Sequence, residues 1–196
     1  MNWKNPVDRW GPVSQTLHWA TALLVVAIAV LGLLMVDLPN NPQKIRLYGL
    51  HKSFGLSLLA LVALRVAWRA YAGAPQRLAS IARWQHRIAG LSHAAMVALL
   101  LAMPLSGWVL NSAAGFPLQW FGLFNLPRIS AKDAALRELA GTLHEAGFWL
   151  LLALVLVHAG AALYHHLFQH DATLARMLPR RPVRAVSTNP ETDHVA

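Results

Sequence analysis

Residues 143–167 read LHEAGFWLLLALVLVHAGAALYHHL, a run with the length and composition of a membrane span. No Asp, Glu, Lys or Arg occurs from Ala146 to His170, whereas a helix needs only about 20 apolar residues to cross a bilayer. Besides His165 and His166 at its end, the quoted stretch carries two histidines farther inside, His144 and His158. Because an imidazole inside a membrane is costly unless it is satisfied, the sequence predicts a transmembrane helix that holds a functional site.

Three other stretches are nearly as apolar. Residues 10–36 carry no charge, and this run is too long for a signal peptide and lacks a small-residue cleavage site. A second uncharged run lies between Arg87 and Arg128. The third stretch, residues 50–69, is apolar except for Lys52 near one end and Arg65 near the other. The sequence therefore predicts four membrane helices at residues 14–36, 50–69, 88–110 and 134–168. A capping box from Ser130 to Asp133 is expected to precede the last of them.

The composition supports a membrane protein. Hydrophobic residues make up 56% of the 196 residues, and charged residues make up only 13%, which excludes intrinsic disorder. The chain has no cysteine, which excludes iron–sulfur clusters, thiolate zinc sites and thiolate-ligated haem. We therefore expect one all-α domain over residues 1–181, an integral membrane four-helix bundle in contact with lipid, and a polar tail over residues 182–196. Basic loops at the membrane surface explain the net charge of +9 without nucleic acid as a partner.

Lysine and arginine near the spans predict the orientation. One side would hold Lys4, Arg9, Arg69, Arg77, Arg83, Arg87, Arg176, Arg180, Arg181 and Arg184. The other side would hold Lys44, Arg46, Lys52, Arg128, Lys132 and Arg137. Because basic residues are enriched on the cytoplasmic side, we expect both termini in the cytoplasm.

Four histidines lie at two depths. His144 and His158 are 14 residues apart on one helix, so about 21 Å along its axis and within roughly 40° of the same face. His18 lies near the inner end of the first helix, and His51 lies near the outer end of the second. The depths pair His18 with His158 and His51 with His144. Two layers of paired imidazoles suit two haem b groups between the helices, with the four histidines as axial iron ligands.

Small residues beside these histidines would let a flat macrocycle approach the backbone. They are Gly55, Gly147 and Gly160.

The histidines also admit two other interpretations. Each imidazole could simply hydrogen-bond a neighbouring helix, as polar side chains in membranes do. Zinc or copper would also accept imidazole, but such a site would be expected to recruit a carboxylate or thiolate as well. The only acidic residue close to the four histidines is Glu145. Four histidines at paired depths favour haem over both alternatives.

Three further polar residues belong to the predicted spans. His93 competes with His18 as the partner of His158; otherwise it would contact a haem propionate, hydrogen-bond a quinone or pack between helices. Arg65 lies 14 residues after His51, at the depth of the inner haem, where it would bind a propionate or snorkel to the interface. Lys52 would serve the outer haem in the same way.

The remaining histidines are expected at the membrane surface. His86 would lie solvated in the inner loop. His165, His166 and His170 cluster at the end of the last helix, where a surface cluster near the terminal carbonyls is favoured over a metal site.

The chain resembles the bacterial cytochrome b561 family from residue 14 to about 181. The motifs that carry the resemblance are LHW at 17–19, LHKSFG at 50–55 with Arg65 and Arg69 downstream, GLSH at 90–93, LHE at 143–145 with His158, YHH at 164–166 and DATLARMLP at 171–179. The last of these is the most specific. The resemblance implies a four-helix inner-membrane protein with two b haems, bound by the same histidine pairs that the depths suggest.

The resemblance also implies a choice of functions. Some members oxidise periplasmic superoxide and pass the electron to ubiquinone, which would make this chain an oxidoreductase. Related four-helix b subunits anchor hydrogenases or formate dehydrogenases and deliver electrons to quinone. We expect a free-standing electron carrier, since the basic outer side would attract superoxide, a small anion. A haem-binding anchor subunit with a redox partner protein is the alternative. A quinone would lie near one haem, with His93, Arg65, Arg69 or Ser92 as donors to its carbonyl.

Overall fold

Four long helices form the body of the protein. The computed structural model describes residues 3–78 and 81–179, and the predicted tail at 182–196 lies outside them. The helices are α1 (Pro12–Val36), α2 (Pro42–Ala72), α3 (Arg83–Ala113) and α4 (Ala134–Leu167), and all four are long and apolar enough to cross a membrane. Two short strands, β1 (Leu118–Trp120) and β2 (Phe124–Leu126), and a 3-10 helix, η1 (Ala175–Met177), complete the described elements. The predicted four-helix membrane bundle is confirmed.

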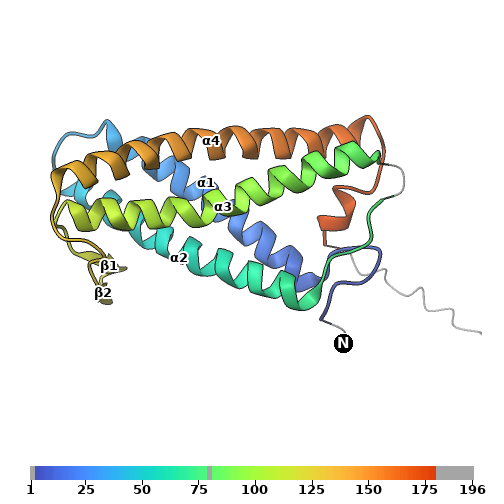
Figure 1. The fold of residues 1–196 in the computed structure, drawn as a ribbon, viewed down its shortest axis with the longest axis horizontal. Helices are drawn as coiled ribbons and strands as arrows, with labels where there is room; N and C mark the ends of the chain where they lie inside the picture. The colour runs from blue at the N-terminus through green and yellow to red at the C-terminus, as the bar shows by residue number, and fades with distance from the viewer. Residues whose placement is uncertain (1–2, 79–80, 180–196) are drawn as a thin grey trace, which may run out of the picture.

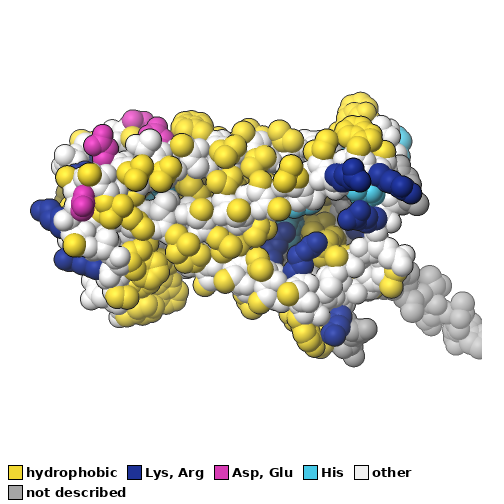
Figure 2. Space-filling view, viewed as in Figure 1, with side chains coloured by type: hydrophobic (Ala, Val, Ile, Leu, Met, Phe, Trp, Pro, Cys, Tyr) yellow, Lys and Arg dark blue, Asp and Glu magenta, His cyan; other side chains and the backbone are white. Residues whose placement is uncertain are grey.

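The helices run in alternating directions (Figure 1). The start of α1, the end of α2, the start of α3 and the end of α4 lie together, and we call this the terminal end. The opposite end carries the β1–β2 hairpin, and we call it the hairpin end. On the face shown in Figure 2, hydrophobic side chains cover the middle of the bundle and lysine and arginine gather at its two ends. That is the surface expected of a bundle whose solvent is lipid.

Two helices begin earlier than predicted. α2 starts at Pro42 because the Asn41 side chain accepts a hydrogen bond from the Lys44 N–H at 2.9 Å, and proline suits the first helical position. α3 starts at Arg83, so the prediction that His86 lies solvated in a loop was wrong. Its imidazole is half-buried, and Nε2 donates to the Leu78 carbonyl at 3.0 Å.

The predicted capping box before α4 was also wrong. The N-cap is Asp133, whose carboxylate accepts from the Leu136 N–H at 2.9 Å. The Ser130 hydroxyl is buried and has no hydrogen-bond partner among the described residues. A single aspartate therefore begins the helix by satisfying one of its free N–H groups.

The segment between α3 and α4, expected to be a loop, contains the hairpin. Leu118 pairs with Leu126 and Trp120 with Phe124, and the turn between them uses Gly122 at φ 74°. The hairpin rests on α2, where Trp120 Nε1 donates to Ser57 Oγ at 3.0 Å. It thereby closes the hairpin end over α2.

The packing is uneven around the bundle. α1 packs on α2, α2 packs on α3 and α3 packs on α4, while the backbone of α4 stays farther from α1 and α2. The buried core is a small cluster at mid-height, made of Leu58, Val62, Met96, Leu100 and Leu151. Leu58 and Leu151 lie seven residues after His51 and His144, so about 10 Å along their helices. The two histidine pairs therefore lie on either side of the apolar core along the bundle axis. They lie where α4 faces α1 and α2, from which its backbone is farther away.

The segment after α4 folds back over the start of α1. Gln15 Nε2 donates to the carbonyls of Arg176 at 3.3 Å and Leu178 at 3.2 Å, and Trp19 Nε1 donates to Met177 at 3.0 Å. The Arg176 guanidinium in turn donates to the Asp8 carbonyl. The specific DATLARMLP ending thus ties the last helix to the first at the terminal end.

The ending is anchored by Asp171. Its carboxylate contacts His165 Nδ1 at 2.5 Å and accepts from the Thr173 N–H at 2.8 Å. Burial alone would raise the pKa of Asp171, but the hydrogen bonds from Thr173 and the contact with His165 together lower it below its ordinary value of 3.8.

Replacing Asp171 with asparagine is expected to loosen residues 171–179. A lowered folded pKa contributes stability above the ordinary pKa, and that stability is lost as the pH falls through the folded value. At neutral pH the variant should therefore exchange the amide hydrogens of this segment about fivefold faster than the parent, a difference that vanishes in acid. Hydrogen exchange read by mass spectrometry measures this, with Asp133→Asn at the hairpin end as the control. Equal exchange in parent and Asp171→Asn at pH 7 would contradict the anchoring role.

Candidate functional site

The structure brings the four predicted histidines together as two pairs. The ring centres of His18 on α1 and His158 on α4 are 6.3 Å apart at the terminal end. The ring centres of His51 on α2 and His144 on α4 are 6.2 Å apart at the hairpin end. An imidazole nitrogen lies about 2.0 Å from a bound metal ion, so two imidazoles on opposite sides of one ion have centres roughly 6 Å apart. Both pairs have this spacing.

At the hairpin end, the imidazoles of His51 and His144 each form a hydrogen bond through Nδ1. His51 Nδ1 lies 3.2 Å from the Ile28 carbonyl, which can only accept, so Nδ1 carries the proton. His144 Nδ1 lies 2.9 Å from Ser106 Oγ, and that hydroxyl donates its own hydrogen to the Met103 carbonyl at 2.8 Å. Ser106 therefore accepts from His144. In both rings the proton on Nδ1 leaves the Nε2 lone pair free for a metal.

Two glycines make room for the same two rings. A Cβ added at Gly32 would lie 3.2 Å from His51 Cε1, and one added at Gly107 would lie 3.3 Å from His144 Cε1. In both cases the added Cβ would lie on the side of the ring that carries Nδ1, the nitrogen that forms the hydrogen bond. Sequence reasoning did not single out these glycines, because they lie on helices other than those of the histidines they touch.

The three glycines expected beside the ligands, Gly55, Gly147 and Gly160, differ in what surrounds them. A Cβ at Gly55 or Gly160 would meet nothing within 4 Å, which agrees with room for a macrocycle beside the ligands. At Gly147, in contrast, an added Cβ would lie 2.6 Å from Met103 Sδ. The missing side chain there lets α3 and α4 pack closely.

At the terminal end, Arg65 contacts one ring of the pair. Arg65 Nη2 lies 3.0 Å from His18 Nδ1. A guanidinium only donates hydrogen bonds, so His18 Nδ1 accepts and the ring proton is on Nε2. This is the opposite tautomer from that of the hairpin-end pair. His18 can therefore present a free Nε2 only when Arg65 finds another acceptor.

His93 lies beside the terminal-end pair. Its ring centre is 5.0 Å from that of His158, shorter than the spacing of the other two pairs. The rings of His93 and His158 meet edge to face at 69°, and the His93 side chain is exposed. Both predicted partners of His158, His18 and His93, therefore lie beside it, and His18 is the more distant of the two.

Among the described residues, Lys52 has no hydrogen bond to either histidine of the hairpin-end pair. Its Nζ donates to Asn111 Oδ1 at 3.1 Å, and Asn111 in turn donates to the Phe116 carbonyl. Lys52 thus ties α2 to the end of α3 and to the segment that leads into the hairpin.

The chemistry of the donor set fits axial ligation. Within residues 3–78 and 81–179, no group of three or more His, Asp or Glu side chains could hold a metal ion, and this includes the cluster of His165, His166 and His170. A zinc or copper site commonly has three or four protein ligands, whereas a haem iron needs only two opposed nitrogens from the protein. The two isolated pairs therefore fit haem better than a bare metal ion.

An apolar four-helix bundle with opposed imidazole pairs at two depths has the construction of a membrane cytochrome. Residues 9–180 match the family model described as prokaryotic cytochrome b561. The chain therefore belongs to the prokaryotic cytochrome b561 family.

Named relatives agree with this family. Cytochrome b561 homolog 2 of Escherichia coli K12 is 35% identical over 185 residues, which cover 91% of this chain and 95% of the relative. Cytochrome b561 homolog 1 of the same organism is 28% identical, over 89% of this chain and 99% of the relative. A protein of Yersinia pestis named probable superoxide oxidase CybB is 28% identical, over 84% of this chain and 93% of its own. The family implies haem b and electron transfer in a bacterial membrane.

Proposed function

We propose that the chain holds two haem b groups, one between His18 and His158 and one between His51 and His144, and carries electrons from a periplasmic donor to quinone. The observation that carries this proposal is the spacing of the two pairs, 6.3 Å and 6.2 Å between ring centres. When bound, each haem supplies an iron that changes reversibly between two oxidation states. The protein supplies the ligands, their orientation and an apolar surrounding.

Each layer would orient its ligands differently. At the hairpin end, the Ile28 carbonyl and the Ser106 hydroxyl fix the proton on Nδ1, so His51 and His144 are already prepared to bind iron. At the terminal end, binding through His18 Nε2 requires Arg65 to release His18 Nδ1. A haem propionate is an acceptor that would attract the freed guanidinium. Lys52 could serve the hairpin-end haem only by exchanging its bond to Asn111.

His93 would then contact the terminal-end haem or the quinone rather than bind iron. Its ring centre lies closer to His158 than two ligands of one iron would allow. His93 is exposed on α3 next to Ser92, and both can hydrogen-bond a quinone carbonyl. Arg69 is a weaker candidate because its guanidinium already stacks on Trp10, 5.2 Å from the ring centre. We therefore place the quinone beside His93 and Ser92 at the terminal end.

Superoxide is the donor that we favour, at the hairpin end. That end carries Arg46 and Arg137, both exposed, beside Lys44 and Lys132, and it would face the periplasm if both termini are cytoplasmic. Figure 2 also shows acidic side chains there, so the attraction of a small anion would be moderate. The Yersinia pestis relative named probable superoxide oxidase supports the same donor.

Superoxide generated enzymatically is expected to reduce the purified haem-loaded protein and, when ubiquinone is added, to reduce the quinone. The rate should fall about two- to fivefold when the ionic strength rises from 0.01 M to 0.5 M, since salt screens the attraction between the anion and the basic end. Stopped-flow spectra of the haem bands measure this, with superoxide dismutase added as the control. No reduction by superoxide would exclude this donor, and a rate that does not change with salt would exclude steering.

The alternative is an anchor subunit that receives electrons from a partner protein. The observation that favours it is the hairpin and the residues just before it, which expose Phe116, Leu123 and Phe124 at the same end of the bundle as the His51–His144 pair. Co-purification of a stoichiometric iron–sulfur protein, lost when these three residues are replaced by serine, would establish it in place of the free-standing carrier.

A further inference from the structure

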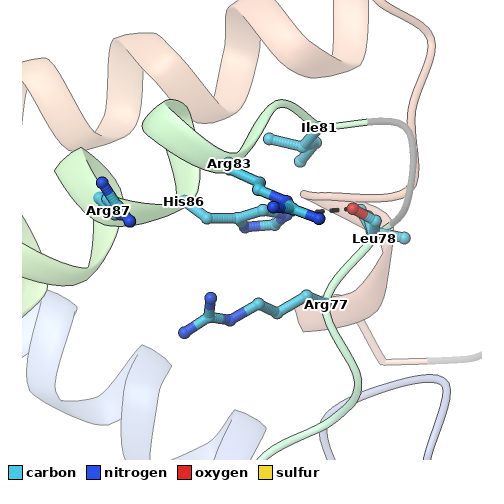
Figure 3. Close-up of a pocket in the computed structure, with 6 residues that line it drawn as sticks. All are labelled: Arg77, Leu78, Ile81, Arg83, His86 and Arg87. Carbon is cyan, nitrogen blue, oxygen red and sulfur yellow. Dashed lines mark hydrogen bonds between the residues drawn. The ribbon is translucent and has the colours of Figure 1, made fainter.

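A basic pocket lies at the terminal end, apart from the two histidine pairs. It has a volume of about 390 Å³ and is formed by the segment after α2 and the first turns of α3. Its lining residues are Arg77, Leu78, Ile81, Arg83, His86 and Arg87. Figure 3 shows Arg77 reaching from the connecting segment back toward α3, from which Arg83, His86 and Arg87 project.

The pocket is held in shape by hydrogen bonds rather than by the arginines. His86 Nε2 donates to the Leu78 carbonyl at 3.0 Å, which joins the connecting segment to α3 (Figure 3). Gln85 Oε1 accepts from the Ala82 N–H at 3.1 Å, and the Gln76 N–H donates to the Val7 carbonyl at 2.9 Å. These bonds fix both walls of the pocket, so the arginines are free to bind something else.

Within residues 3–78 and 81–179, no other group balances the charge of the pocket. Arg77, Arg83 and Arg87 are all exposed, and none of their guanidinium groups has a hydrogen bond or ion pair with any other described residue. Among the described residues, no acidic side chain lines the pocket. Arg83 and Arg87 are four residues apart, so they project from one face of the helix, and the N-terminal end of α3 adds its own positive dipole. Three unpaired guanidinium groups around one hollow favour an anion with several oxygen atoms.

The pocket lies at the level where a membrane surface would be. Ile88 and Leu91 follow within about two turns and are 59% and 74% exposed, as expected of side chains that face hydrocarbon. Trp84, in the first turn of α3, is 62% exposed, and tryptophan is typical of the membrane interface. In a membrane, the three guanidinium groups would therefore lie at headgroup depth, next to acyl chains.

We propose that this pocket binds the headgroup phosphate of an anionic phospholipid. Arg77, Arg83 and Arg87 would contact the phosphate oxygens, and the apolar surface at Ile88 and Leu91 would contact the acyl chains. Basic pockets at the membrane surface recognise anionic headgroups in this way. The inference stands on the pocket, its charge and its depth, and it does not depend on the proposed electron donor or acceptor.

Lipid binding to the haem-loaded protein tests the proposal. The detergent-purified protein would be mixed with equal amounts of phosphatidylglycerol and phosphatidylcholine, and the bound lipids counted by native mass spectrometry. We expect selective retention of phosphatidylglycerol, weakened about fivefold for each arginine removed. Two pocket variants are compared with the parent. One is the double variant Arg83→Gln/Arg87→Gln, and the other is the single variant Arg77→Gln, which is the milder change. The matched control is Arg46→Gln with Arg137→Gln, which removes two exposed arginines at the hairpin end.

The outcomes separate the possible ligands. Loss of phosphatidylglycerol in both pocket variants but not in the control supports the proposal. Equal retention of the two lipids by the parent overturns it, as does unchanged selectivity in both pocket variants. A third arm adds inorganic phosphate at the lipid concentration. If inorganic phosphate displaces phosphatidylglycerol at that concentration, the pocket is a site for a soluble anion and the lipid proposal is wrong.

Discussion

Replacing His158 with alanine is expected to remove the terminal-end haem and lower the haem content from about two per chain to about one. The reason is that one imidazole alone leaves the iron without its opposed ligand. His18→Ala should remove the same haem, because its ring faces His158 at 6.3 Å. His51→Ala and His144→Ala should both remove the other. The measurement is the haem-to-protein ratio, combined with reduced-minus-oxidised spectra that show which haem remains.

His93→Ala is the matched control for this experiment. His93 lies beside the same pair, so its loss disturbs the surroundings of the haem without removing a ligand. It should keep both haems and change quinone reduction instead. If His93→Ala loses the terminal-end haem while His18→Ala retains it, the assigned pairing is wrong. A purified parent with no haem would contradict the proposed function as a whole.

Replacing Gly107 with leucine is expected to remove the hairpin-end haem without changing any ligand. Even a Cβ at this position would lie 3.3 Å from His144 Cε1, and the rest of a leucine side chain would push the ring out of line with His51. Gly32→Leu should have the same effect through His51, where the Cβ would lie 3.2 Å from Cε1. The haem content should fall to about one per chain in each variant.

Gly49→Leu is the control for these variants, since nothing lies within 4 Å of a Cβ at that position. It lies on α2, two residues before His51, and should keep both haems. Circular dichroism would check that all three variants remain helical. Full haem content in both Gly107→Leu and Gly32→Leu would show that these glycines do not shape the ligand rings.

Much of this architecture was predictable from local sequence. Three uncharged runs and one run interrupted only by Lys52 and Arg65 located the four spans. The polar first turns of α2 and α3 were missed because hydropathy does not report a helix that extends beyond the membrane. The spacing of His144 and His158 predicted two depths, because the rise of a helix is fixed. The hairpin at residues 118–126 was missed because its strands are only three residues long and rest on α2.

Details of the candidate site could not be predicted from the sequence. Nothing in the local pattern joins Ser106 to His144, or Gly32 to His51, since these residues lie on different helices. Likewise, Arg65 was expected near a propionate, but its contact with His18 Nδ1 depends on how α1 and α2 turn toward each other.

The sequence alone determined that four helices cross a membrane and that imidazoles occupy two levels within it. Hydropathy and the rise per residue are properties of each helix by itself, so depth can be calculated without knowing the neighbours. Tertiary structure decided which ring faces which, which nitrogen carries the proton and which glycine gives each ring its space. These depend on the rotation and lateral packing of the helices, and helices of the same depth can meet in several ways.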